Sequence, residues 1–232
     1  MVTDGYTNRA NIRVALKKYE GAVADYTRAL ELAPLAKDRW VTLLNRGATL
    51  NKMGRRLDAL NDLERAVPLA QASRDNQARF ALLGRADVYH SLGRYGEAAA
   101  DLAAVVELSP VDVQPFWLRL ALDNLEAGRR AEGLGIARRV AAKFDLEPET
   151  NLAICSMLWR DGTEVEHEEA LRRYAFLPTQ TKERMEVLDY EDRGWPPNAE
   201  AAARKFLREA KPQAQPADAL TESSGPAPAE AI

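Results

Sequence analysis

The sequence has few of the residues on which metal sites and many catalytic centres depend. Its 232 residues include one cysteine, Cys155, and two histidines, His90 and His167, which lie far apart. A single cysteine excludes an intramolecular disulfide, gives no basis for a cysteine-rich metal site and fits a reducing compartment. No nucleophile motif, acid–base pair or glycine-rich phosphate loop stands out. We therefore expect no enzyme activity, no bound metal and no cofactor.

Charge of one sign and long hydrophobic runs are also missing. The 32 basic and 35 acidic residues give a net charge of −3, and the acids of the segment 212–232 account for that value. Nucleic-acid binding would need clustered positive charge, and a membrane-spanning helix would need roughly 18 apolar residues in a row. The first residues lack the apolar stretch of a signal peptide. We expect an intracellular protein, cytoplasmic as the sequence stands, that neither binds nucleic acid nor spans a membrane.

The chain does contain an internal repeat. Three segments, 8–34, 45–70 and 84–110, align with one another, and the register continues in 119–144. In the first three copies an arginine precedes an aspartate by sixteen residues, and in the fourth Leu120 and Ile136 take the two places. A repeat of this length indicates a solenoid of stacked units. The arginine–aspartate pairs are Arg9 with Asp25, Arg46 with Asp62 and Arg85 with Asp101.

Each copy predicts a helix, a short turn and a second helix. Apolar and small residues recur at helical spacing, and no alternation typical of a strand has useful length. Gly54, Gly93 and Gly128 come just after a predicted helix, where a left-handed residue is favourable, but the first copy has no such glycine. The predicted helices cover about 4–17 and 20–32, 39–53 and 56–71, 77–92 and 95–108, and 114–127 and 130–143.

The segments "LGRYGEAAADLAAVVELSP" (92–110) and "YEGAVADYTRALELAP" (19–34) resemble tetratricopeptide (TPR) repeats. The resemblance implies an all-α right-handed superhelix of helix hairpins that binds other proteins. We expect repeats at about 3–36, 40–73, 79–112 and 114–147, within 1–146, then a degenerate fifth repeat at 147–178. A helical cap at 179–211 and a disordered acidic tail at 212–232 would follow. More loosely, the repeats resemble those of cyanobacterial and plastid TPR proteins, which allows a plastid location if a transit peptide has been removed.

The arginine–aspartate series has two interpretations. The arginines could form a basic track for an acidic ligand, or each pair could join the two helices of one hairpin. A ligand track gives no reason for the fourth copy to lose the aspartate together with the arginine. A buried pair does, because one partner left alone costs about 3–5 kcal/mol, whereas replacing both with apolar residues can be neutral. The sequence therefore favours structural ion pairs.

TPR proteins that grip the C-terminal carboxylate of chaperones use two asparagines with lysines and an arginine. Carried over to this chain, the asparagines match Asn11 and Asn45, but the lysine sites fall on Thr7 and Phe80 and the arginine site falls on Gly84. Without these cations the chain lacks the charge that captures a carboxylate. We therefore expect the partner to be something other than a chaperone C-terminus.

The predicted inner groove is more apolar than a solvated surface. It would bind a peptide or a helix of a partner, or else these residues pack on neighbouring repeats or under the chain's own C-terminal helices. The leading hypothesis is a non-catalytic scaffold or adaptor that assists the assembly of a complex. The alternative is a regulatory or substrate-recruiting part of a larger enzyme or membrane complex. The predicted groove residues are Asn11, Val41, Leu44, Asn45, Asn51, Phe80, Leu83, Asp87, His90 and Leu118.

Overall fold

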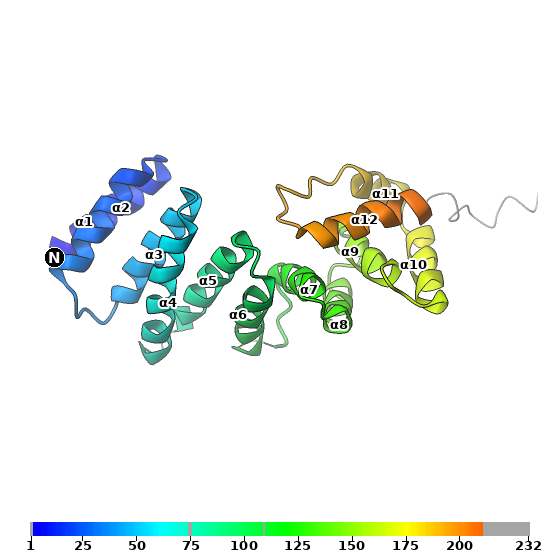
Figure 1. The fold of residues 1–232 in the computed structure, drawn as a ribbon, viewed down its shortest axis with the longest axis horizontal. Helices are drawn as coiled ribbons and strands as arrows, with labels where there is room; N and C mark the ends of the chain where they lie inside the picture. The colour runs from blue at the N-terminus through cyan, green and yellow to red at the C-terminus, as the bar shows by residue number, and fades with distance from the viewer. Residues whose placement is uncertain (1, 74–75, 109, 211–232) are drawn as a thin grey trace, which may run out of the picture. The chain divides into compact units, whose positions relative to one another are not determined.

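The computed structural model describes residues 2–73, 76–108 and 110–210, and every regular element in these ranges is a helix (Figure 1). The all-α prediction is therefore confirmed, while the predicted tail at 212–232 lies outside the described residues. The chain divides into two compact units, residues 1–136 and 137–232, and the division falls within α8. We call them the N-terminal and the C-terminal unit.

Consecutive helices form hairpins along the N-terminal unit, and each hairpin packs on the next through α2 with α3, α4 with α5 and α6 with α7. This order is the one that the repeats predict. The α-helices up to the division are α1 (Val2–Ala15), α2 (Tyr19–Leu32), α3 (Arg39–Lys52), α4 (Arg56–Ser73), α5 (Arg79–Ser91), α6 (Tyr95–Leu108), α7 (Phe116–Glu126) and α8 (Arg130–Ala141), with a short 3₁₀ helix at Asn76–Ala78.

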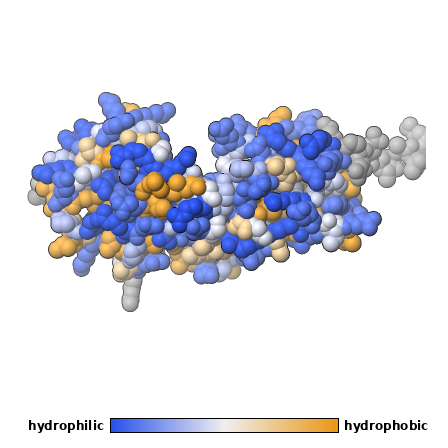
Figure 2. Space-filling view, in the orientation of Figure 1, coloured by the Kyte–Doolittle hydropathy of each residue, from blue (hydrophilic) through white to orange (hydrophobic). Residues whose placement is uncertain are grey.

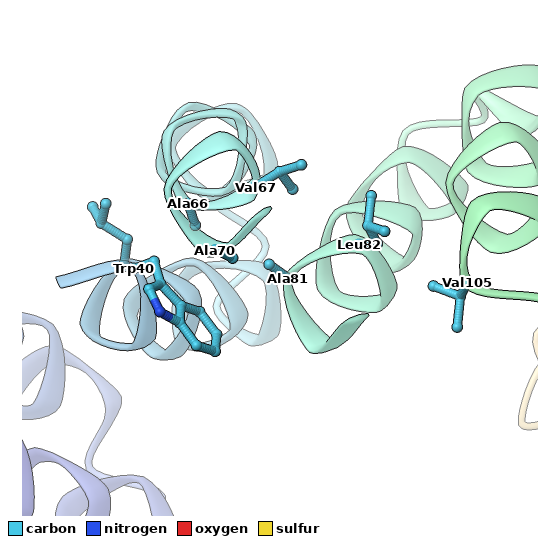
Figure 3. Packing of buried hydrophobic residues seen from close by; sticks show 8 residues of the cluster. Trp40, Ala66, Val67, Ala70, Ala81, Leu82 and Val105 are labelled. Carbon is cyan, nitrogen blue, oxygen red and sulfur yellow. The ribbon is translucent and has the colours of Figure 1, made fainter. Parts of the chain in front are cut away.

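Small residues allow the helices of a hairpin to approach closely. A Cβ atom at Gly47 would lie 2.9 Å from Leu63 Cγ, and one at Gly133 would lie 2.6 Å from the Ala121 carbonyl oxygen. Larger side chains then fill the spaces between hairpins. Figure 3 shows one such cluster, in which Trp40, Val67, Leu82 and their neighbours from α3 to α6 are buried together. This alternation of small and large residues produces a continuous core across repeats.

The four turns within the hairpins share one backbone conformation. Gly54, Gly93 and Gly128 have φ angles of 76°, 72° and 79°, and Lys17 takes the same place in the first hairpin with φ 57°. The hydrogen bonds also correspond: Lys18 N donates to Arg13 O, as the residue after each glycine donates to a carbonyl five residues earlier. The first repeat therefore makes the same turn with a side chain that the left-handed region disfavours.

Replacing Lys17 with glycine is expected to stabilise the chain by about 1 kcal/mol, because it removes the Cβ conflict of a left-handed lysine. Urea unfolding followed by circular dichroism measures this change. Gly54→Ala is the matched control and should destabilise by a similar amount. A neutral or destabilising Lys17→Gly change would show that the lysine side chain contributes more than its backbone strain costs.

The C-terminal unit is built around α9 (Pro148–Trp159), which is buried almost throughout its length. It contacts α10 (Glu164–Phe176), α11 (Thr179–Glu186) and α12 (Pro197–Ala210). The rings of Trp159 and Tyr174 both pack edge-on against Phe206 of α12, and Trp159 Nε1 donates to Glu209 Oε2 over 2.9 Å. Helix α12 thus covers the α9–α10 hairpin with its apolar face.

Candidate functional site

The three arginine–aspartate pairs are bidentate salt bridges between the two helices of one hairpin. Arg46 donates from Nε and Nη2 to the two Asp62 oxygens, both over 2.7 Å, and Arg9 and Arg85 contact Asp25 and Asp101 in the same way. The aspartates are buried. Hydrogen bonds from Arg9 hold the pKa of Asp25 below its usual range. These arginines are therefore occupied within the fold.

Arg46 and Arg85 also face the preceding repeat. Arg46 Nη1 donates to Thr27 Oγ1 of α2 over 2.9 Å. At the next junction, the hydrogen bond from Arg85 to Asp101 raises the arginine pKa, and Glu64 of α4 adds to the rise. In the fourth copy the buried Leu120 packs with Ile136 and Ala103 in one apolar cluster. At this junction the residue of the preceding repeat is apolar too, because Ala103 takes the place that Thr27 and Glu64 have at the earlier junctions.

Asn11 and Asn45 line one hollow of about 230 Å³ between α1, α2 and α3. Tyr26 Oη donates to Asn11 Oδ1 over 2.6 Å, which leaves the Asn11 amide nitrogen as a donor in a fixed orientation. Over the residues that the structure describes, neither the Asn45 side chain nor the Lys52 ammonium has a protein partner. The hollow therefore offers hydrogen-bond donors to an acceptor from outside.

A second hollow, of about 310 Å³, lies nearer the first turns of α1 and α3. Thr7 and Val41 line it, together with the backbone and side chains of the α2–α3 connection. The two hollows lie on the same pair of helices, and each is lined by both polar and apolar residues. We use the name α1–α3 groove for the surface that carries both hollows.

The apolar groove residues divide into a packed and an exposed group. Leu44 fills the space beside Gly84, where a Cβ atom would lie 2.7 Å from its Cδ1, and Leu83 packs on two core clusters. Val41 is half-buried, and Phe80 is 44% exposed. Hydrophobic side chains gather over the middle of the N-terminal unit on the face drawn in Figure 2. The packing interpretation thus applies to Leu44 and Leu83, while the Phe80 ring is exposed at the surface.

The remaining predicted groove residues do not form one open surface. Asp87 pairs with Arg119 of α7, and His90 Nδ1 lies 2.7 Å from Asp123 Oδ1. Asn51 is half-buried, and its Oδ1 atom has no partner among the described residues. The placement of Leu118 on the groove is wrong, because this side chain is 7% exposed and belongs to the core around α7.

Sequence reasoning missed Asp123, a carboxyl side chain that is fully buried. One of its oxygens meets His90, and the other has no hydrogen-bond partner among the described residues. An aspartate inside the apolar run "LALDNL" (120–125) is the signal that could have identified it. The pair joins the third hairpin to the fourth, and by the register of the repeats Asn51 and Val88 occupy the corresponding positions of the second and third hairpins.

The described residues contain no group of three histidine, cysteine, aspartate or glutamate side chains that could hold a metal ion. Cys155 is fully buried, and burial raises the pKa of its thiol to about 12. A thiol in this state is not an effective nucleophile at neutral pH.

Comparison with known proteins agrees with this architecture. The family model described as "Tetratricopeptide repeat" matches residues 3–34 and, in a second version, residues 81–112. The chain is a tetratricopeptide repeat protein. The two matched segments are the first and third TPR hairpins, and the predicted TPR resemblance is confirmed. No curated protein sequence matches the chain.

Solved TPR structures share the fold. The structure titled "Crystal structure of MamA protein" is 17% identical, with a TM-score of 0.64 over 81% of this chain and 96% of that one. YrrB, titled "a TPR protein with an unusual peptide-binding site", is 20% identical, with a TM-score of 0.59 over 72% and 82%. A TPR protein from Parabacteroides merdae is 16% identical, with a TM-score of 0.64 over 92% and 80%. At these identities the likeness establishes the fold alone.

TPR hairpins generally serve as protein-interaction modules rather than as catalytic domains. Across residues 2–73, 76–108 and 110–210, no helix of this TPR chain is both long and apolar enough to cross a membrane. The α1–α3 groove is the candidate interaction surface, and the exposed Phe80 ring lies outside its two hollows, at the start of α5.

Proposed function

We propose that this TPR protein is a non-catalytic scaffold that binds a peptide segment of a partner protein in the α1–α3 groove. The observation that carries the proposal is the hollow formed by Asn11, Asn45 and Lys52. Its donors are available, and Tyr26 holds one of them in a fixed orientation. A site that is ordered before binding loses less entropy on association than a flexible one.

The chemistry of the groove defines the segment that would fit. Backbone carbonyls or an acidic side chain would accept hydrogen bonds from Asn11 and Asn45, and Lys52 would add positive charge. An apolar side chain of the same segment would pack on Val41, and a segment long enough to continue to α5 would place a second one on the exposed Phe80 ring. YrrB, which has the same fold, is described as having a peptide-binding site, and this supports the use of a TPR groove for a peptide.

The proposal predicts that Asn45→Ala weakens binding of a groove peptide by about 5- to 10-fold. This range corresponds to the net loss of one hydrogen bond, about 1 kcal/mol. Peptides would first be selected from a displayed random library on the full chain, and their affinities would then be measured by fluorescence anisotropy. The Phe80→Ala variant should weaken the same peptides, because the exposed ring loses its apolar contact.

Leu57→Ala is the matched control, since Leu57 is an exposed leucine of α4 that lies outside the groove. It should leave affinity unchanged, and all three variants should keep the helical circular dichroism signal. Selected peptides that bind the Asn45→Ala and Phe80→Ala variants as tightly as the unmodified chain would exclude the groove as the binding site.

A further inference from the structure

The outer face of α1 is exposed where the corresponding faces of later repeats are buried. Ile12 is 61% exposed and Leu16 is 60% exposed. By the register of the repeats, Ile12 corresponds to Thr49 and Val88, which are both buried. Two exposed aliphatic side chains one helical turn apart form an apolar patch, which is unusual on a solvated helix face. We define the end face as Arg9, Ile12, Arg13, Leu16 and Lys18.

The junctions between repeats show what covers the corresponding faces of the second and third repeats. At the second repeat, Val23 of α2 packs on the cluster that contains Leu50. At the third repeat, Leu60 of α4 is buried in one cluster with Val88, and Leu92 packs on it. In both cases the cover is an amphipathic helix that lies along the face. The packing of α2 on the second repeat and of α4 on the third therefore shows the kind of contact that the end face could make with a helix.

The charges of the end face match the same kind of helix. At the third repeat, Glu64 of α4 adds to the rise in the pKa values of Arg85 and Arg94. Arg9 and Lys18 are the corresponding residues of the first repeat, and Arg13 lies close to Arg9 because both arginines bind Asp25. Two arginines thus share a single carboxylate, and Lys18 adds a third positive charge to the end face. An incoming glutamate would meet an excess of positive charge.

The geometry points to the end face as a docking site for an amphipathic helix of another polypeptide that imitates α4. This helix would place apolar side chains on Ile12 and Leu16, and a glutamate, in the position of Glu64, beside Arg9 and Lys18. A two-fold arrangement of two copies would instead bring the cations of both chains together, at an electrostatic cost. The site is separate from the α1–α3 groove, because none of its residues lines either hollow.

The test uses a stapled helical peptide with the sequence of residues 56–67, because an unstapled helix of this length is marginal in water. Its affinity for the full chain is measured by fluorescence anisotropy. Ile12→Asp is expected to weaken binding at least about 10-fold, since it removes the burial of a large aliphatic side chain. A peptide carrying Glu64→Lys should bind equally poorly, and Lys18→Glu in the chain should restore part of its affinity.

Asn45→Ala is the matched control from the groove and should leave binding of this peptide unchanged, so the two sites can fail independently. Because Ile12 is exposed, its replacement should not alter the melting temperature. Equal affinity of the peptide for the Ile12→Asp and unmodified chains would overturn the proposal. So would sedimentation data showing a dimer that Ile12→Asp dissociates, because a second copy would then be the occupant.

Discussion

Replacing Arg46 alone with leucine is expected to destabilise the chain by about 3–5 kcal/mol. The change leaves the Asp62 carboxylate without its guanidinium, and this carboxylate is 2% exposed, so water cannot replace the lost partner. The double variant Arg46→Leu with Asp62→Ile should recover most of the loss, because it reproduces the Leu120–Ile136 pair of the fourth hairpin. Urea unfolding followed by circular dichroism measures both changes.

The structure adds a third residue to this experiment. Thr27 accepts a hydrogen bond from Arg46, and the residue in its place at the junction of the third and fourth hairpins is Ala103. Adding Thr27→Ala to the double variant should therefore recover further stability. If the single and double variants unfold at the same urea concentration, the salt bridge does not contribute as a buried pair.

Gly162→Ala is expected to destabilise the C-terminal unit by about 3 kcal/mol, near the upper end of the usual cost of overpacking. A Cβ atom at this position would lie 1.9 Å from the Leu158 carbonyl oxygen, which is backbone and cannot rotate away. The α9–α10 turn would have to open. Hydrogen exchange read by mass spectrometry should then show faster exchange in α9 and α10.

Gly96→Ala is the control for this change, because a Cβ atom at Gly96 has no heavy atom within 4 Å and the residue lies within α6. It should stabilise the chain by about 0.5–1 kcal/mol, the usual helix preference for alanine over glycine. If the two alanine variants had the same effect, close packing at Gly162 would not be the cause.

Periodicity was sufficient to predict the hairpins because their turns and small-residue contacts recur in register. Gly54, Gly93 and Gly128 mark three turns directly, while Lys17 makes the turn of the first hairpin without a sequence signal. A left-handed lysine is tolerated there because the surrounding hydrogen bonds are the same as in the other turns. Local residue preference alone therefore leaves such a turn uncertain, and the tertiary context determines it.

The candidate site was harder to predict because groove residues differ from repeat to repeat. Helical spacing placed Leu118 on the same face as Leu44, but spacing does not say which faces the fold covers. Leu118 is buried and Phe80 is exposed, although both occupy groove positions in the repeat register. The Tyr26 contact that orients Asn11 joins two helices, so no short motif records it.

The most direct test of the central claim is a hydrogen-exchange footprint of a selected peptide on the full chain. Bound peptide should slow exchange in α1 and α3, around Asn11 and Asn45, and at the N-terminal turn of α5 near Phe80. The C-terminal unit should exchange at its unbound rate. Protection confined to the C-terminal unit, or to the second helices of the hairpins, α2, α4 and α6, would contradict the assignment of the α1–α3 groove as the binding surface.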